Sequence, residues 1–476
     1  MIKKFNKLIM LSVLAFYTLT ATSAERPNIL LILADDLGYA DVGFNNGAPD
    51  IKTPKIDKLA ENGLQFAQAY TAHPFCGPSR AALMTGLYPH KIGSQFNLPA
   101  AGSDFGISLK EPFISKVLQD SGYFTGAIGK WHLGEAPDFH PNKRGFDEFF
   151  GFLGGGHVYF PEKYLPKYDS MIKRNAKNIW NYLLPMERNG VEERQTEYVT
   201  DFLSTEAISF IDKAKGKSQP FFLYLAYNAP HTPLEAKEDD LALFSDIKDI
   251  KRRTYVAMVY AMDRGIGRIT ARLKANNQLD NTLIVFLSDN GGKTSQGGRN
   301  FPLKEGKGSV QEGGYRTPML FHWPAKIKSG TQYPHPVLAI DFYPTFVQLA
   351  QAKLPNGKEL HGKKMWPHII NGTEVHKNEA FYVLRHREKG SDVASRKGQW
   401  KAISNGNKGW RLYNIYDDMA ENNDLSSKHP NILKDMVEEM HQWTKSNSKP
   451  NWFHAPSAEK TWKENKMPRF EETFGL

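Results

Sequence analysis

Uninterrupted apolar runs recur along this chain and alternate with longer amphipathic stretches. The runs at residues 28–34, 220–226 and 281–287 are dominated by Leu, Ile, Val, Phe and Ala. Continuous apolar runs of this length are typical of strands that are buried on both faces of a parallel sheet. The stretches at 200–214 and 252–276 have the length and spacing of helices that connect such strands. The pattern predicts an α/β fold in which helices sandwich a large, mixed but mostly parallel sheet.

Shorter elements complete the predicted sheet and its helical layers. Pro54 and Gly63 bracket a helix, because proline suits the first helical turn and glycine ends helices. The sequence also predicts helices at 114–121 and 341–350 and strands at 64–70, 122–128 and 318–324. The glycine-rich stretch 149–157 is predicted as a loop, since it lacks the strand–helix context of a dinucleotide site. The aromatic and basic residues of 158–198 predict an insertion over the functional face of the sheet.

The pattern changes in the C-terminal quarter of the chain. Turn-rich segments there separate the predicted strands of a small antiparallel sheet, at 380–384, 400–403 and 410–415. A helix is predicted at 432–444. We therefore expect a main domain at 25–366 and a C-terminal subdomain with a tail at 367–476. The aromatic and basic tail after Asn451 is expected to pack back against the main domain.

The first residues have the organisation of a secretory signal. A basic segment at 1–7 precedes an apolar run at 8–19, and small residues lead to a cleavage site after Ala24. We expect residues 1–24 to be removed and the protein to be exported, as a periplasmic or secreted bacterial protein without stable membrane insertion. The apolar run is short for a membrane span, but an uncleaved anchor is the alternative.

Composition narrows the classes of partner. Lys and Arg total 61 against 51 Asp and Glu, giving a formal net charge of +10, which suits an anionic substrate or surface. The sequence contains no basic block or nucleic-acid-reading motif, so nucleic acid is not an expected partner. A chain with one cysteine has no internal disulfide, and its stability must come from packing.

Polar side chains follow three of the predicted core strands at the point where each strand ends. Asp35 and Asp36 follow the first strand, and Asp289 and Asn290 follow the last of the three. The carboxyl ends of parallel strands meet at one edge of a sheet, so these side chains are expected to lie together. Their oxygen atoms suit a hard divalent cation, although acids after a single strand can also be ordinary loop residues. His231, held between prolines after another strand, is expected at the same edge.

The single cysteine, Cys76, lies between Pro74 and Pro78. Proline restricts the backbone there, and a helix is expected to start at Pro78 and to end before Gly86. Cys76 would then lie at the positive end of a helix, where backbone N–H groups favour an anion. An isolated cysteine is more often an inert buried thiol, so its sequence neighbours decide between the two interpretations.

Cys76-x-Pro78-Ser79-Arg80, followed by Thr85-Gly86, resembles the signature of the type I formylglycine sulfatases of the alkaline-phosphatase-like superfamily. The segment Gly129-Lys-Trp-His-Leu-Gly134 and the glycine-rich loop around Lys307 also resemble that family, and residues 412–425 resemble its C-terminal subdomain. The resemblance implies that a separate maturation enzyme oxidises Cys76 to formylglycine (3-oxoalanine). It further implies that one hydroxyl of the hydrated aldehyde attacks sulfur and that deprotonation of the other expels sulfate.

The resemblance also implies residue roles. One Ca²⁺ per chain would be held by Asp35, Asp36, Asp289, Asn290 and the residue derived from Cys76. The catalytic residues would be Cys76, Arg80, Lys130, His132, His231 and Lys307, and the substrate-binding residues Lys130, His157, His231 and Lys307. Arg80 would orient the diol, His132 would be the base and His231 the acid. In an extended segment, Lys130 and His132 would point to the same side.

The function that follows from the resemblance is hydrolysis of sulfuric esters. The expected substrate is a sulfated polysaccharide or its oligosaccharides, with carrageenan-type galactans first and ulvan, fucan or glycosaminoglycans behind them. One alternative is a phosphomonoesterase or phosphonate monoester hydrolase of the same superfamily. Another is a non-catalytic protein that binds sulfated glycans and keeps Cys76 as a thiol.

Overall fold

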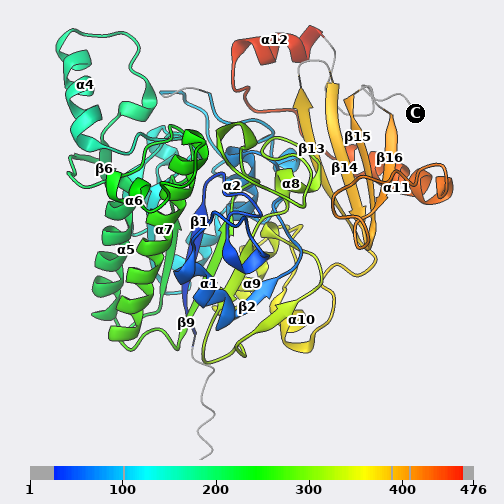
Figure 1. Ribbon diagram of the computed structural model, residues 1–476, viewed down its shortest axis with the longest axis horizontal. Coiled ribbons are helices and arrows are strands. Elements are labelled where there is room, and N and C mark those ends of the chain that lie inside the picture. The colour runs from blue at the N-terminus through cyan, green and yellow to red at the C-terminus, as the bar shows by residue number, and fades with distance from the viewer. Residues whose placement is uncertain (1–25, 100–101, 388–389, 407–408, 465–476) are drawn as a thin grey trace, which may run out of the picture.

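The computed structural model describes residues 26–99, 102–387, 390–406 and 409–464, and the predicted signal at 1–24 lies outside these ranges. Within them, ten strands form one large sheet in the order β11-β2-β10-β9-β1-β8-β4-β5-β6-β7 (Figure 1). Its strands are β1 Asn28–Ala34, β2 Leu64–Phe66, β4 Phe124–Lys130, β5 Glu148–Phe152, β6 Met186–Arg188, β7 Val191–Glu193, β8 Phe221–Ala226, β9 Thr282–Ser288, β10 Met319–His322 and β11 Thr331–Tyr333. Strands β9, β1, β8, β4 and β5 are parallel, whereas β10 and β6 run antiparallel to their neighbours. The predicted mixed, mostly parallel sheet is confirmed.

Different helices cover the two faces of this sheet. On β1, Ile29, Leu31 and Leu33 join one hydrophobic cluster, and Leu30 and Ile32 join the other. Helices α2, α3 and α9 contribute to the first cluster, and α1, α5 and α7 to the second. The helices of the described ranges are α1 Pro54–Glu61, α2 Cys76–Thr85, α3 Ile114–Asp120, α4 Pro161–Lys173, α5 Val199–Lys215, α6 Glu238–Ala242, α7 Ile250–Ala275, α8 Glu312–Tyr315, α9 Phe342–Leu349, α10 Trp366–Asn371, α11 Pro430–Thr444 and α12 Pro456–Glu464.

Two segments differ from the prediction. Residues 64–70 form two short strands instead of one, because β2 pairs in the large sheet while the next strand pairs elsewhere. This separate two-stranded sheet consists of β3 Ala69–Tyr70 and β12 Val337–Leu338. The stretch 149–157, predicted as a loop, begins inside β5. A Cβ at Gly151 would lie 2.0 Å from the carbonyl oxygen of Gly129 on β4, so close strand approach explains this glycine.

A second sheet, antiparallel and four-stranded, lies C-terminal to the first, in the order β13-β14-β15-β16. Its strands are β13 Ala380–Arg387, β14 Gly390–Lys397, β15 Trp400–Asn405 and β16 Trp410–Asn414. Met436 of α11 packs against β15 and β16, in agreement with the predicted sheet-plus-helix subdomain. Strand β14 was not predicted, because it has few apolar residues and is held by pairing on both sides. The boundary after residue 366 stays a prediction, since Val375 still packs in the core of the large sheet.

Charged side chains are buried where the four-stranded C-terminal sheet contacts α8. Nζ of Lys401 on β15 lies 3.0 Å from Oε1 of Glu312 and 2.9 Å from Oε1 of Glu421. All three side chains are excluded from solvent, and the backbone N–H of Glu312 donates to Glu421 at 2.8 Å. Buried charges persist only when they are paired. This triad therefore ties α8 to the C-terminal sheet.

The tail returns to the main body, as predicted. The backbone N–H of Asn451 donates to the carbonyl oxygen of Gly93 at 2.8 Å. The indole N–H of Trp452 donates to the carbonyl oxygen of Phe96 at 2.9 Å, and the Trp452 side chain packs in the core of the large sheet. A buried tryptophan with a satisfied N–H anchors the tail.

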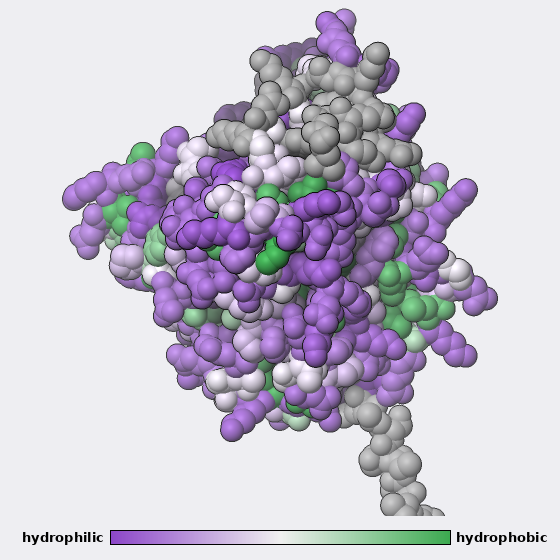
Figure 2. Space-filling view, turned by 90° about the vertical axis from the view of Figure 1, so that its right-hand side faces the viewer, coloured by the Kyte–Doolittle hydropathy of each residue, from purple (hydrophilic) through white to green (hydrophobic). Residues whose placement is uncertain are grey.

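The surface seen in Figure 2 is mainly hydrophilic, with hydrophobic residues in small separate groups. Scattered hydrophobic residues of this kind are normal on folded proteins. Among the residues that the structure describes, no helix is both long and apolar enough to cross a lipid bilayer.

Candidate active site

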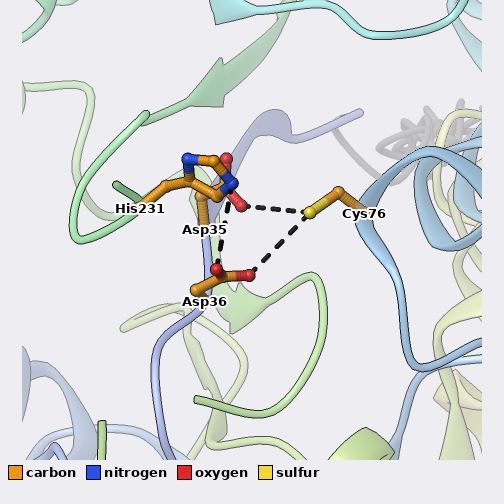
Figure 3. A group of neighbouring side chains, drawn as sticks. All are labelled: Asp35, Asp36, Cys76 and His231. Atoms are coloured by element: carbon orange, nitrogen blue, oxygen red, sulfur yellow. Dashed lines mark hydrogen bonds and ion pairs between the residues drawn. The ribbon is translucent and has the colours of Figure 1, made fainter. Parts of the chain in front are cut away.

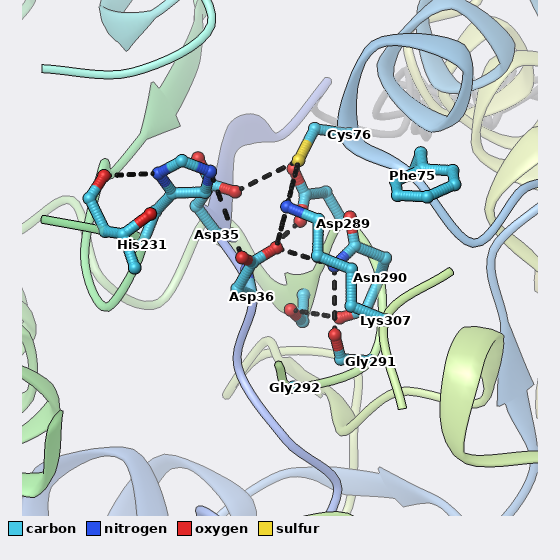
Figure 4. Close-up of polar contacts among 12 residues, drawn as sticks. Asp35, Asp36, Phe75, Cys76, His231, Asp289, Asn290, Gly291, Gly292 and Lys307 are labelled. Carbon is cyan, nitrogen blue, oxygen red and sulfur yellow. Dashed lines mark hydrogen bonds and ion pairs between the residues drawn. The ribbon is translucent and has the colours of Figure 1, made fainter. Parts of the chain in front are cut away.

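The carboxyl ends of neighbouring strands of the large sheet converge on Cys76 (Figure 4). Asp35 and Asp36 follow β1, Lys130 ends β4, and His231 follows β8. The structure brings together the predicted metal and catalytic residues, which are Asp35, Asp36, Cys76, Arg80, Lys130, His132, His231, Asp289, Asn290 and Lys307. This is the arrangement expected when parallel strands end at one edge.

Cys76 is the first residue of α2, so the prediction that this helix begins at Pro78 is wrong. Proline is tolerated within a first turn, because the N–H groups there have no intrahelical partner. The sulfur atom of Cys76 lies 3.3 Å from Oδ1 of Asp35 and 3.1 Å from Nζ of Lys307. Burial, together with the charges of Asp289 and Asp35, raises the pKa of the Cys76 thiol well above its ordinary value. The unmodified sulfur is therefore protonated and a poor nucleophile.

Side chains around this sulfur lie close enough together to be candidate ligands of a metal ion (Figure 3). Four residues each offer one potential ligand atom, and these four atoms all lie within 4.8 Å of one another. The residues are Asp35, Asp36, Cys76 and His231. Asn290 donates from Nδ2 to Oδ1 of Asp36 at 2.8 Å, while its own Oδ1 is buried without a hydrogen-bond partner among the described residues. An orphaned buried oxygen beside two carboxylates fits a hard cation such as Ca²⁺.

Asp289, the remaining predicted ligand, is held by Arg80. Nε and Nη2 of Arg80 lie 3.0 Å and 2.9 Å from Oδ2 of Asp289, and both side chains are fully buried. Nη1 of Arg80 donates to the carbonyl oxygen of Lys130 at 3.1 Å. Burial and the charge of Asp35 raise the pKa of Asp289 despite these cations. A bound metal ion would lower that pKa again and relieve the repulsion among the carboxylates.

Two lysines place positive charge beside the sulfur. Nζ of Lys307 lies 2.6 Å from Oδ1 of Asp36, and Nζ of Lys130 pairs with Oδ2 of Asp35. Burial alone would lower the pKa of both lysines, but the nearby carboxylates outweigh burial and raise it. Both ammonium groups remain charged and can meet an anionic group that binds next to Cys76.

His132 and His231 are neutral imidazoles in this environment. Burial and the charges of Lys130 and Lys307 lower the pKa of both rings, to about 3 for His231. Nδ1 of His231 faces the carbonyl oxygen of Thr232 at 2.7 Å, so it carries the proton and Nε2 is free to accept one. The predicted extended course from Lys130 to His132 is wrong. Strand β4 ends at Lys130 and His132 has a φ of 60°, so the backbone turns there.

His157, predicted to contact substrate, lies outside this group. Its ring is buried between Phe152 and Tyr164, with ring centroids 5.1 Å and 4.8 Å away. Its two ring nitrogens face the carbonyl oxygens of Val158 and Leu184. The ring is buried and both nitrogens face backbone carbonyls instead of the space beside Cys76, so the predicted substrate contact of His157 stays a prediction.

A cavity of about 380 Å³ opens beside the sulfur of Cys76. Its lining comprises Cys76, Asn97, Leu98, Pro99, His132, Glu135, Gly155, Trp180, Asn181, Tyr182, His231 and Lys307. Residues 180–182 belong to the stretch predicted as an insertion over the functional face, and they lie there. Asn97, Glu135, Asn181 and Tyr182 were not identified from the sequence, and only the aromatic composition of 158–198 pointed towards this region.

Comparisons with known proteins agree with this arrangement. The sulfatase family model matches residues 27–352, and the model "N-sulphoglucosamine sulphohydrolase, C-terminal" matches residues 306–446. Arylsulfatase J of Mus musculus is 31% identical over 469 residues, covering 89% of this chain and 76% of that protein. N-acetylgalactosamine-6-sulfatase of Homo sapiens is 34% identical over 372 residues, covering 75% of this chain and 68% of that protein.

Among solved structures, the complex of Ps i-CgsB with k-i-k-neocarrahexaose is 57% identical, with a TM-score of 0.93, and the match covers 95% of this chain and 100% of that one. The PsFucS1 sulfatase from Pseudoalteromonas sp. is 26% identical with a TM-score of 0.74, covering 89% of this chain and 90% of that one. The family model spans most of the chain, and the aligned relatives are sulfatases. The chain therefore belongs to the sulfatase family of the alkaline-phosphatase-like superfamily and is a sulfuric ester hydrolase.

Proposed function

We propose that this sulfatase removes sulfate from a sulfated polysaccharide or its oligosaccharides, with a carrageenan-type galactan as the first candidate. The observation that carries the substrate class is the likeness to Ps i-CgsB, which is 57% identical and was solved with k-i-k-neocarrahexaose. The cavity supports the proposal, because it combines the cation of Lys307 with an exposed aromatic side chain, Trp180.

The reaction sets three requirements. A sulfate ester is a monoanion with a poor alkoxide leaving group, so its cleavage needs a nucleophile, neutralisation of the sulfuryl oxygens and a proton for the departing oxygen. The residues that converge on Cys76 can meet each requirement.

The nucleophile in this proposal is formylglycine made from Cys76 by a separate maturation enzyme. The hydrated aldehyde supplies one hydroxyl for attack on sulfur and a second whose deprotonation expels sulfate, an exit that a thiol lacks. The environment of the unmodified residue supports this chemistry, because the Cys76 thiol is buried and its pKa is raised. Arg80, which is fixed by a hydrogen bond and an ion pair to Asp289 and interacts with residue 76 through its charge, would orient the modified residue.

A single Ca²⁺ is proposed beside residue 76. Asp35, Asp36, Asp289 and Asn290 would hold it, together with the residue derived from Cys76. When bound, the ion supplies positive charge that favours an ionised hydroxyl and the sulfuryl oxygens. The unsatisfied Oδ1 of Asn290 supports this site, since a buried amide oxygen without a partner is costly.

Lysines and histidines of the chain supply the remaining steps. Lys130 and Lys307 neutralise the sulfate group, because both remain charged next to the nucleophile. His132 accepts the proton during breakdown of the intermediate, as its neutral ring allows. An incoming sulfate raises the pKa of His231, and the protonated ring then donates to the leaving alcohol.

The proposal includes export. The basic segment, apolar run and small-residue cleavage site within residues 1–24 support a signal peptide and a periplasmic or secreted location. The positive net charge of the chain also suits an anionic extracellular polysaccharide as the substrate.

The test is sulfate release from a purified panel of carrageenan-type, ulvan, fucan and glycosaminoglycan oligosaccharides, with an aryl phosphate as the comparison substrate. We expect release from at least one carrageenan-type oligosaccharide and none with Cys76→Ala. Turnover of the phosphate ester in preference to every sulfate ester would overturn the proposal. So would a folded, aldehyde-bearing enzyme that releases no sulfate from any of these glycans.

A further inference from the structure

Two features of the cavity take no part in the proposed reaction. One is a stacked aromatic pair, Trp180 and Tyr182, and the other is the carboxylate of Glu135. Both line the same cavity as Cys76, His231 and Lys307. A substrate that reaches the sulfur must therefore pass them.

The aromatic pair is a face-to-face stack, in which the outer ring, Trp180, offers a platform to a ligand and the inner ring, Tyr182, lies next to His231. The two rings stack with centroids 4.7 Å apart and an interplanar angle of 23°, and Trp180 is 50% exposed. On the inner side, the ring of Tyr182 lies 6.2 Å from that of His231. Exposed aromatic surface inside a cavity marks a binding site, because burying it against a ligand is favourable.

Two glycines allow side chains of the cavity to pack closely against the neighbouring loop. A Cβ at Gly156 would lie 2.4 Å from the ring of Tyr182, and one at Gly155 would lie 2.8 Å from Nε2 of His132. Glycine at these two positions therefore lets the rings of Tyr182 and His132 approach the backbone more closely than any other residue would permit. The position of Tyr182 is set by the fold, which gives a rigid face to the ligand.

Glu135 is unusual in a cavity that admits an anion. Its Oε2 accepts a hydrogen bond from the backbone N–H of Gly102 at 3.1 Å. Its Oε1 lies near Gly154, on the same side as Nδ2 of Asn181. Within the described ranges of the chain it forms no ion pair, and burial raises its pKa. A carboxylate left without a cation can accept a hydrogen bond from a neutral hydroxyl and repels a second anion.

We infer that Trp180, Tyr182 and Glu135 form a subsite for the sugar ring that carries the scissile sulfate. The apolar C–H face of the ring lies on the aromatic pair, and Glu135 accepts a hydrogen bond from a free hydroxyl next to the sulfated carbon. A ring with a second sulfate on that adjacent carbon is rejected by the charge of Glu135. This inference rests on the proposed function and specifies which sulfation patterns the site admits.

The first test concerns the charge. Two oligosaccharides of the same galactan backbone are compared, one with a single sulfate on the terminal ring and one with sulfates on two adjacent carbons. Glu135→Gln keeps the shape and one acceptor oxygen but removes the charge. We expect the ratio of kcat/KM for the disulfated to the monosulfated substrate to rise by about tenfold or more. Glu192→Gln is the matched control, because Glu192 lies in the 158–198 stretch but pairs with Arg194 on the surface.

The second test concerns the platform. Trp180→Ala is expected to raise KM for the monosulfated oligosaccharide by about tenfold with kcat changed less than about twofold, because it removes binding shared by ground and transition states. Trp180→Phe restores most of the affinity. Since Trp180 is exposed, its replacement leaves the core intact.

The outcomes separate the inference from the proposed function. If the wild-type enzyme releases no sulfate from either oligosaccharide, the proposed function fails and the inference fails with it. If the wild type acts but prefers the disulfated ring, or Glu135→Gln leaves the ratio unchanged, the role of Glu135 is overturned alone. An unchanged KM in Trp180→Ala overturns the platform.

Discussion

Arg385 of the C-terminal sheet lies over the ring of Phe75, with its guanidinium carbon 4.8 Å from the ring centre. The same guanidinium donates from Nη1 to the carbonyl oxygen of Gly308. Phe75 precedes Cys76, and Gly308 follows Lys307. One side chain of the four-stranded sheet therefore holds the two segments that carry Cys76 and Lys307.

The first prediction tests this link. Arg385→Ala is expected to lower kcat by about tenfold with a smaller change in KM, because small displacements of reacting groups are costly to rate. Arg385→Lys keeps the charge over the ring but lacks the planar fork, so it should recover part of the activity. Arg387→Ala is the control, since Arg387 lies on the same strand and its exposed side chain pairs with the buried Asp392. A loss of stability with kcat unchanged would contradict the positioning role.

A second prediction concerns the buried pair of Arg80 and Asp289. Arg80→Met leaves a buried carboxylate without its partner, so the free energy of unfolding should fall by about 3–5 kcal/mol. Arg272→Met is the matched control, because Arg272 likewise pairs with one carboxylate, that of Asp212, but at the surface. Its loss of stability should be much smaller, because exposed ion pairs contribute little. Chemical denaturation of both variants checks this, and similar small losses would count against a structural role for the pair.

The third prediction concerns the chemical state of residue 76. Mass spectrometry of the peptide that contains Cys76 should show the lighter aldehyde in active protein, because the buried thiol with its raised pKa is a poor nucleophile. Protein made without the maturation enzyme should fold normally and release no sulfate. Full activity with an intact thiol would exclude the aldehyde.

The fourth prediction concerns the metal. After removal of divalent ions by a chelator, added Ca²⁺ should raise the melting temperature, because a ligand that binds only the folded state stabilises it. Mg²⁺ should have a smaller effect, since it requires a tighter octahedral arrangement. Asn290→Ala should weaken the response to Ca²⁺, while Asp50→Asn, which affects a carboxylate paired with Arg252, should keep it. An equal response in Asn290→Ala would remove Asn290 from the site.

The fifth prediction concerns pH and lies away from the active site. Nε2 of His376 lies 2.8 Å from Oδ2 of Asp341. Burial alone would lower the pKa of His376, and the charge of Lys363 lowers it further. Asp341, together with Glu379, outweighs both and raises the pKa above 6.5. The ion pair of His376 with Asp341 therefore contributes its full stabilisation at a pH below the pKa that His376 has in the unfolded chain. This stabilisation is lost as the pH rises through the pKa of His376 in the folded protein.

The measurement is the melting temperature of wild type and His376→Gln across pH. The difference should be larger near about pH 5.5 than near about pH 9, because only the protonated ring forms the ion pair. His368→Gln serves as the control, since His368 is exposed on α10 and bonds to Thr373. A difference that does not vary with pH would show that His376 acts through packing alone.

Much of the reaction centre could be predicted from the sequence, for a topological reason. Buried parallel strands read as continuous apolar runs, and their carboxyl ends must meet at one edge of the sheet. Asp35, Asp36, Asp289 and Asn290 each follow such a run, and the structure places them together beside Cys76. The local sequence was therefore enough to predict that the residues at the ends of core strands lie together.

Only the tertiary structure decided the surroundings of that centre. Glu135, Asn97 and Tyr182 lie in irregular segments without periodicity, so nothing local shows that they share one cavity. His157 was predicted to contact substrate, and only the fold shows that its ring nitrogens lie buried against backbone carbonyls.

The same limit applies to the link between the two sheets. Strand β14 has little apolar content and exists because strands pair with it on both sides, and Arg385 reaches Phe75 across more than half of the chain. The sequence by itself determined the layered sheet and the residues at its strand ends, because strand burial and strand direction are written in local patterns. The cavity beside Cys76 and the contacts between sheets depend on packing between distant segments, which is settled only when the chain folds.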